Sequence, residues 1–140
     1  MKTNKYKEFK ETQQNKINDF TKENMFFAFS QSQFEDWLKK LNTTKDKITQ
    51  THYGWFILTE KLNDYKKLNS FLDEELKEFL QDSKNLLDAF KYELSNHEYC
   101  ITYNHDNTLN SLNLSFNYLN EEQKQILEQA KKDYLKNIIY

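Results

Sequence analysis

The chain of 140 residues contains no arginine, no proline, no valine and a single glycine, Gly54. Loops that wrap around a phosphate need several glycines, because the backbone must come close to the ligand. A P-loop and a dinucleotide-binding turn are therefore excluded. Arginine is the usual residue for bidentate contacts with guanine or phosphate, and this chain has only lysine in its place. We expect no direct, sequence-specific binding of nucleic acid.

Cysteine is nearly absent as well. The single Cys100 leaves no partner for an intramolecular disulfide, which is typical of proteins in a reducing cytosol. The basic N-terminus lacks the apolar stretch of a signal peptide. The longest apolar runs, Met25–Phe29 and Trp55–Leu58, are too short to cross a bilayer. We expect a cytoplasmic protein without a membrane segment.

Aromatic residues are plentiful: eleven Phe, nine Tyr and two Trp make up 16% of the chain. Each aromatic ring buries much more area than an alanine or a valine. A chain of this length is ordinarily one domain with one hydrophobic core, and no Pro-, Gly- or Ser-rich linker interrupts it. We expect residues 1–140 to form a single domain with a core of a few large side chains.

The spacing of apolar residues predicts secondary structure along the chain. Helices are expected over residues 4–22, 30–42, 59–94 with a break near Asp82, and 120–138, with a short turn after Asp106. Strands are expected over 25–29 and 53–58, and 99–103 is a third strand or an extended connection. The polar stretch 43–50 is expected to be a connection. Ser30 with Gln33 and Asn120 with Gln123 have the spacing of capping boxes.

The resulting fold class is α+β and mostly α. Two or three short strands are not stable alone and must be covered by helices. We therefore expect about five helices packed on a small two- or three-stranded antiparallel sheet.

Charge and exposed aromatics indicate where a partner could bind. Twenty lysines against 22 acidic residues give a net charge of −2, which is typical neither of polyanion-binding proteins nor of DNA mimics. The densest acidic run is a solvated helix face or a docking surface for a basic partner. Exposed tryptophan and tyrosine are common anchors of binding surfaces. The candidate partner-binding residues are Asp73, Glu74, Glu75, Glu78, Asp82, Trp37, Tyr53 and Trp55.

A reactive or metal site has weaker support. His97, Glu98, Cys100 and His105 are metal-ligand types close together in sequence, and a Cys–His pair is a conceivable nucleophile. Their spacing matches no zinc pattern, and the lone cysteine has no CxxC partner. We predict no catalytic residue, no metal and no cofactor, with a metal-binding or hydrolytic protein centred on these four residues as the alternative.

Three blocks of sequence, spread over roughly residues 5–135, resemble a small uncharacterised family. They are Phe26–Ser30 with Gln33–Glu35, Tyr92–Tyr99, and Thr108-Leu109 with Leu112–Leu114. Members of that family are encoded largely by phages, plasmids and other mobile elements of low-GC Gram-positive bacteria. This chain departs from the family pattern at Trp37, where glycine is frequent, and keeps only Gly54 before the second strand.

The resemblance carries no catalytic residue with it, but it implies a context. Small proteins of mobile elements commonly bind and disable host machinery. The leading hypothesis is a non-enzymatic binding protein in the cytoplasm of a bacterial host, which inhibits a defence nuclease in the manner of an anti-CRISPR protein. Its partner would be a host protein such as a nucleoprotein effector, bound through the acidic helical face. A homo-oligomeric accessory protein, for instance a homodimer, is the remaining alternative.

Overall fold

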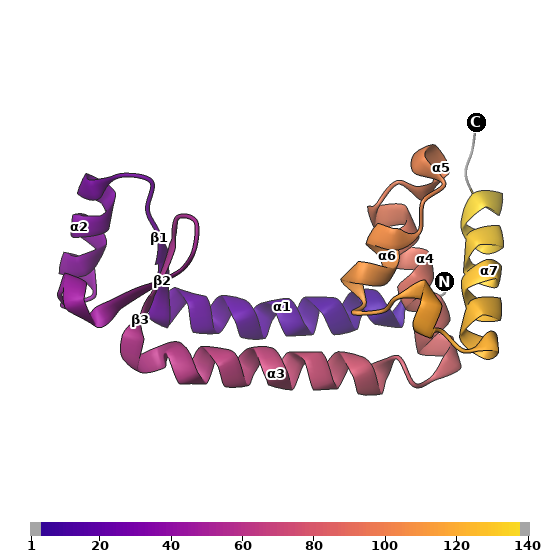
Figure 1. The fold of residues 1–140 in the computed structure, drawn as a ribbon, viewed down its shortest axis with the longest axis horizontal. Helices are drawn as coiled ribbons and strands as arrows, with labels where there is room; N and C mark the ends of the chain where they lie inside the picture. The colour runs from indigo at the N-terminus through magenta and orange to yellow at the C-terminus, as the bar shows by residue number, and fades with distance from the viewer. Residues whose placement is uncertain (1–3, 138–140) are drawn as a thin grey trace. The chain divides into compact units, whose positions relative to one another are not determined.

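The computed structural model describes residues 4–137 and shows a mostly helical chain with one small antiparallel sheet (Figure 1). The expected fold class is confirmed. The helices are α1 (Lys5–Asn24), α2 (Gln31–Lys40), α3 (Leu62–Phe79), α4 (Ser83–Asn96), α5 (Tyr99–Thr102), α6 (Asp106–Ser111) and α7 (Glu121–Lys136). The strands are β1 (Met25–Phe27), β2 (Ile48–His52) and β3 (Trp55–Leu58). Short 3-10 turns lie at Lys45–Lys47, Thr59–Lys61 and Phe116–Tyr118.

The described chain divides into two compact units. The sheet unit comprises residues 12–73, and the helical unit comprises residues 4–11 together with 74–137. Both boundaries fall inside helices, one within α1 and one within α3.

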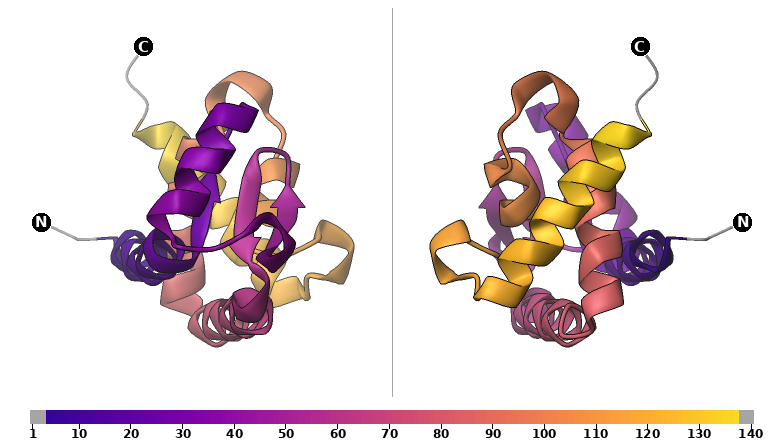
Figure 2. Two further views of the ribbon diagram at one scale, coloured as in Figure 1. Left: turned by 90° about the vertical axis from the view of Figure 1, so that its left-hand side faces the viewer. Right: turned by 90° about the vertical axis from the view of Figure 1, so that its right-hand side faces the viewer.

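The sheet unit has three layers. Strand β3 lies between β1 and β2, and both pairs are antiparallel. Because side chains alternate along a strand, Phe26 and its partner Phe56 lie on one face, while Met25 and its partner Ile57 lie on the other. Helix α2 covers the Phe26 face. The left view of Figure 2 shows α1 and α3 nearly end-on, with the strands and α2 above them.

Aromatic rings hold α2 on the sheet. The Phe26 ring stacks on Trp37 and on Phe56, with ring centroids 5.6 Å and 5.3 Å apart, and Phe34 meets Phe56 edge-on at 5.0 Å. Such pairs stabilise by about 0.5–1.5 kcal/mol beyond the area they bury. Few but large side chains therefore form this core, as the composition predicted.

The helical unit is built around α4 and α7, which pack along each other (Figures 1 and 2). Leu86, Phe90 and Leu94 of α4 are almost fully buried, as are Leu127 and Ala130 of α7. These residues follow the three- and four-residue spacing of one helix face. The apolar stripes expected from the sequence therefore form this core.

Side-chain caps define where three helices begin. The Ser30 hydroxyl accepts from the backbone N–H of Gln33 at the start of α2, and Asp82 accepts from Lys84 and Asn85 at the start of α4. Asn120 and Gln123 form a complete capping box at the start of α7. The predicted Asn120 box and the predicted break near Asp82 are confirmed.

Two local predictions were wrong. Residues 99–103 form no strand: Tyr99–Thr102 is one helical turn between two left-handed residues, Glu98 and Tyr103. The stretch 43–50 is not only a connection, because β2 begins at Ile48. Neither segment has enough residues for its periodicity to distinguish a strand from a turn.

None of the helices within residues 4–137 combines the length and the apolar composition needed to cross a bilayer.

Candidate protein-binding surface

A tight hairpin between β2 and β3 positions the aromatic residues of the sheet unit. Gly54 has φ +78°, a left-handed conformation that side chains rarely adopt. A Cβ atom at this position would lie 2.6 Å from Cε2 of Phe27, so the turn also needs glycine for space. The Gly54 carbonyl accepts from the N–H of Ala28 at 2.9 Å, which joins the turn to the end of β1.

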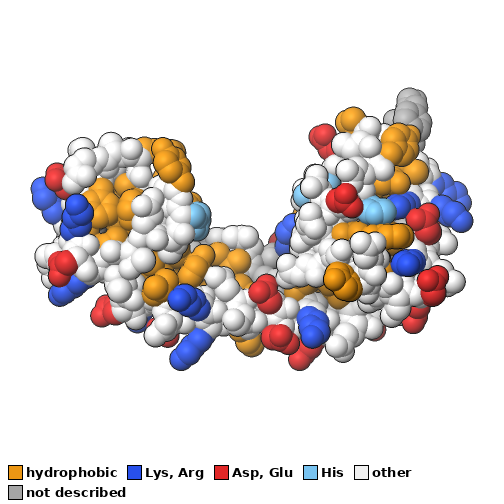
Figure 3. Space-filling model, viewed as in Figure 1, with side chains coloured by type: hydrophobic (Ala, Val, Ile, Leu, Met, Phe, Trp, Pro, Cys, Tyr) orange, Lys and Arg blue, Asp and Glu red, His pale blue; other side chains and the backbone are white. Residues whose placement is uncertain are grey.

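A row of aromatic side chains follows from this packing. Phe27 contacts Phe29 edge-on at a centroid distance of 4.4 Å and Trp55 at 5.2 Å. The Phe29 side chain is 74% exposed and Tyr53, at the tip of the hairpin, is 85% exposed. Figure 3 shows hydrophobic side chains reaching the surface around α2, the strands and the adjoining part of α1. Phe29 is held by its contact with Phe27 and is open to solvent, and an aromatic side chain placed in this way can be buried by a partner at little entropic cost.

A groove of about 370 Å³ lies between α1, α3 and the hairpin of the sheet unit, and we call it the helix groove. Its lining side chains are apolar or uncharged polar groups, and none is a lysine, aspartate or glutamate. They are Gln14, Ile17, Asn18, Phe20, Thr21, Met25, His52, Trp55, Tyr65, Leu68 and Asn69. In a chain with 30% charged residues, this is a distinct local composition.

The two helices of the groove are tied together along their length. The Gln13 amide donates to the Leu72 carbonyl at 2.9 Å, and the rings of Phe20 and Tyr65 lie 5.8 Å apart. Trp55 and Met25 of the sheet close one end. The groove is therefore a preformed feature of the sheet unit.

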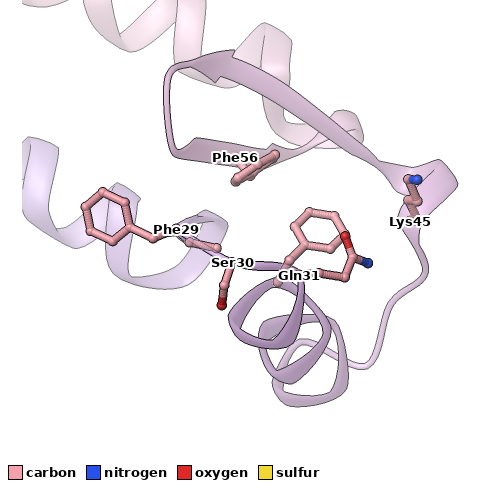
Figure 4. A pocket seen from close by; sticks show the side chains of 7 residues that line it. Phe29, Ser30, Gln31, Lys45 and Phe56 are labelled. Atoms are coloured by element: carbon pink, nitrogen blue, oxygen red, sulfur yellow. The ribbon is translucent and has the colours of Figure 1, made fainter.

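A second pocket of about 250 Å³ lies where α2 begins, and Phe34 and Phe56 are part of its lining (Figure 4). In the figure Phe29, Ser30 and Gln31 line one side, and Lys45 stands at the far end. Lys45 is the one charged residue of its lining. Phe29 thus belongs both to this pocket and to the aromatic row.

The predicted partner-binding aromatics occupy three different environments. Tyr53 lies in the exposed turn, and Trp55 lines the helix groove. Trp37 is half-buried on α2, stacked on Phe26 and covered by the Lys40 ammonium 4.7 Å from its ring centroid. Trp55 and Tyr53 therefore lie at the groove and the hairpin, whereas Trp37 packs within the core of the sheet unit.

The predicted acidic residues lie on α3 and just after it. Asp73, Glu74 and Glu78 are exposed, and Glu75 is half-buried. Asp82 is the N-cap of α4, so its carboxylate already accepts two backbone hydrogen bonds. This residue has a structural role in addition to its charge.

The residues of the metal or hydrolase alternative are not brought together. Burial, followed by the Cys100 side chain nearby, raises the pKa of the Tyr134 phenol. Nδ1 of His105 lies 2.9 Å from Nζ of Lys131, and burial together with that charge lowers the His105 pKa. Among residues 4–137, no three side chains of the ligating types are placed to share a metal ion.

His97 has neighbours of the types found in a hydrolase triad, but not the geometry. Its Nε2 atom is 2.7 Å from Oγ of Ser111 and 3.2 Å from Oε2 of Glu93. In a triad the acid and the nucleophile contact opposite ring nitrogens. Here they share one nitrogen, and the Ser111 hydroxyl donates to the Asn107 carbonyl at 2.9 Å. The contact joins α4 to α6 and provides no activated nucleophile.

Glu93 on α4 is fully buried in the helical unit, and it is not among the site residues predicted from the sequence. Its Oε1 accepts from the Tyr6 hydroxyl and from Lys10 Nζ, both at 2.8 Å. Burial alone would raise the pKa of Glu93. The hydrogen bonds from Lys10 and Tyr6 and the charge of Lys10 lower this pKa by more than burial raises it, so the net shift is downward. Burial, followed by the bond to Glu93, raises the pKa of Tyr6. This cluster fixes the start of α1 against α4.

The groove residues of α1 and α3 were also not predicted. A signal for them exists in the sequence: Gln14, Asn18 and Thr21 share a helix face with Ile17, and this face carries no charge over two turns. A solvated face of a soluble helix normally carries charges.

Comparison with known proteins identifies the family. The chain belongs to a family of unknown function, DUF7659, whose model matches residues 5–137. No curated protein and no solved structure matches the chain. The expected membership of a family without an assigned activity is confirmed, and the match brings no enzymatic activity with it.

Proposed function

We propose that this member of a family of unknown function is a non-enzymatic binding protein that contacts its partner through the sheet unit, with the helix groove at the centre of the contact. One observation carries the proposal: the eleven residues that line the groove include no Lys, Asp or Glu. The core of a protein–protein interface is depleted in charge and enriched in aromatics and methionine, which matches this lining.

The neighbouring aromatics support the same surface. Tyr53 and Phe29 are mostly exposed, and Trp55, which shares the Phe27 ring as a neighbour with Phe29, lines the groove. Large aromatic side chains near the centre of an interface commonly carry most of the binding energy. The acidic run on α3 has the complementary role in this proposal, because exposed charges mainly steer encounter with a basic partner.

The proposed partner is a host defence nuclease in the bacterial cytoplasm, inhibited in the manner of an anti-CRISPR protein. What supports this choice is the resemblance of three sequence blocks to a family carried by phages and plasmids. An RNA-guided nuclease of a low-GC Gram-positive host is therefore the first partner to assay.

The test uses a pair of adjacent substitutions on α3. Asn69 and Ser70 are both exposed, but only Asn69 lines the groove. The variants Asn69→Glu and Ser70→Glu therefore carry the same charge change one residue apart. Binding of each purified variant to the nuclease is measured together with inhibition of DNA cleavage.

We expect Asn69→Glu to weaken binding at least about tenfold, because the glutamate is buried without a partner, and Ser70→Glu to leave binding unchanged. A charge-reversed variant at Asp73, Glu74, Glu75 and Glu78 should bind more slowly but retain inhibition. Equal binding by the Asn69 and Ser70 variants would contradict the groove as the contact. Lack of any binding to defence nucleases would contradict the proposed partner.

A further inference from the structure

We propose that the helix groove receives a single amphipathic α-helix of the partner, through a contact face of apolar and uncharged polar side chains. This inference rests on the proposed function and specifies the binding mode and the chemistry of the bound segment.

The walls of the groove are themselves helices. The α1 wall presents Gln14, Ile17, Asn18 and Thr21, which have the i, i+3, i+4, i+7 spacing of one helix face. The α3 wall presents residues 65, 68 and 69 with the corresponding spacing. A third helix lying in such a groove packs its ridges between those of the two walls, as in a helix bundle.

The length of the groove also suits a helix. From Gln14 to Thr21 the α1 wall extends about 10 Å, at 1.5 Å per residue. This is two helical turns, the span over which an amphipathic helix presents four anchor residues to a groove.

An extended peptide fits less well. Addition of a strand requires a run of unpaired backbone groups along one sheet edge. The sheet contributes Met25, His52 and Trp55 to the groove, which is one residue from each of three strands. The groove therefore offers no continuous strand edge for pairing.

The lining determines the charge of the bound face. A lysine or glutamate buried against these side chains would lose its hydration without gaining a charged partner, which disfavours binding. Leucine, isoleucine, methionine or phenylalanine can fill the apolar floor around Ile17 and Leu68. The amides of Gln14, Asn18 and Asn69 at the groove can pair with serine, threonine, asparagine or glutamine.

A second copy of this chain does not supply such a helix. Among the described residues, the apolar stripes of α2, α4 and α7 are already occupied within their own units. Helices α5 and α6 have four and six residues and are too short to present anchor residues over the two turns of the groove. Helices α1 and α3 are themselves the walls of the groove. The bound helix therefore comes from a different protein.

The experiment uses two displayed peptide libraries as probes of the full-length chain. One presents helix-stabilised peptides of about 18 residues, with randomised residues at i, i+3, i+4 and i+7. The other presents extended peptides of the same length and diversity. Selected peptides are measured against the unmodified chain, Asn69→Glu and Ser70→Glu, with circular dichroism to check that each variant is folded.

We expect binders from the helical library alone, with apolar or uncharged residues at the randomised positions. Their affinity should fall at least about tenfold on Asn69→Glu and stay unchanged on Ser70→Glu. Binders only from the extended library, no binders from either, or helical binders indifferent to Asn69→Glu would overturn the inference.

A second measurement separates this inference from the proposed function. A photo-reactive amino acid is placed at Leu68 in the groove, with Ser70 as the matched position outside it, and crosslinking is carried out with the target nuclease. A crosslink from Leu68 to a helical segment of the partner supports both proposals. A crosslink from Leu68 to a loop or strand overturns the helical mode and leaves the binding function standing. A crosslink to another copy of the chain, or no crosslink from Leu68, would contradict both the proposed binding function and the helical binding mode.

Discussion

A fully buried carboxylate is costly unless its charge is compensated, and Glu93 shows how this chain does so. Lys10 supplies the opposite charge, while Tyr6 and Asn96 supply hydrogen bonds. The Lys10 side chain stays 42% exposed and also lies over the Tyr92 ring, 5.2 Å from its centroid. No local sequence pattern indicates that Lys10 and Tyr6 meet Glu93, because they lie 83 and 87 positions from it.

Replacement of this carboxylate should alter both stability and its dependence on acid. We expect Glu93→Gln to lower the free energy of unfolding by about 1–3 kcal/mol at neutral pH, since a buried charge-assisted bond is lost. The folded-state pKa of Glu93 lies below its ordinary value of 4.5. Its stabilisation is therefore complete above pH 4.5 and is lost as the pH falls through the lowered pKa.

Urea unfolding of both proteins between neutral pH and about pH 3 measures this effect. The Glu93→Gln variant should lose less stability on acidification than the unmodified chain. Glu11→Gln, an exposed change on α1, is the control and should follow the unmodified chain. Parallel losses for Glu93→Gln and the unmodified chain would show that this carboxylate does not contribute to acid sensitivity.

At the scale of the element, the hairpin depends on its one glycine. Gly54→Ala should destabilise the protein by about 2–4 kcal/mol, because the left-handed backbone is strained and the new Cβ meets the Phe27 ring. Thermal or urea unfolding measures the change. The control is Tyr53→Ala, a change of the 85% exposed residue that precedes Gly54, and it should leave stability nearly unchanged. Comparable losses of stability in both variants would show that the left-handed conformation of Gly54 does not cause the destabilisation.

The start of α4 allows a test that separates a cap from a binding charge. Asp82 accepts from the backbone N–H of Lys84 at 2.9 Å and of Asn85 at 3.1 Å. Asp82→Ala should cost about 1 kcal/mol of stability, whereas Asp82→Asn keeps an accepting oxygen and should cost little. If Asp82→Asn nevertheless weakened partner binding, the charge of this residue would be part of the contact.

Local sequence signals predicted most of these elements because their causes are local. The Asn120–Gln123 box and the Leu86, Phe90, Leu94 stripe involve residues within one helix. The wrong predictions concern segments whose secondary structure depends on tertiary contacts. Tyr99 is buried in the core of the helical unit, and its segment winds into a helical turn although its composition suits a strand. Strand β2 was missed because polar residues are acceptable on an edge strand.

The candidate surface was predicted only in part for the same reason. Tyr53 and Trp55 stood out as aromatic residues beside the one glycine of the chain. Ile17 and Leu68, in contrast, look like ordinary members of amphipathic helices. Their proximity in one groove depends on the pairing of two helices whose groove residues are more than 40 positions apart. No single stretch of sequence contains that information.

At the scale of the whole molecule, charge is nearly balanced, with a net charge of −2, and the lining of the helix groove includes no Lys, Asp or Glu. Two modes of partner binding therefore differ in their response to salt. A contact dominated by the acidic residues of α3 would weaken as salt screens its charges. A contact centred on the groove depends on apolar burial, which salt does not screen.

Raising NaCl from about 0.1 M to about 1 M shortens the Debye length from about 10 Å to about 3 Å. We expect the dissociation constant for the partner to change by less than about threefold over this range, with the association rate falling more than the dissociation rate rises. Surface plasmon resonance with the unmodified chain and the charge-reversed variant at Asp73, Glu74, Glu75 and Glu78 measures both rates. The association rate of the variant should rise with salt instead of falling, because its charges now repel the basic partner, and its dissociation rate should stay unchanged. The opposite outcome is a loss of affinity by a factor of ten or more in high salt that the charge-reversed variant does not show. It would indicate that the partner binds the acidic face and not the groove.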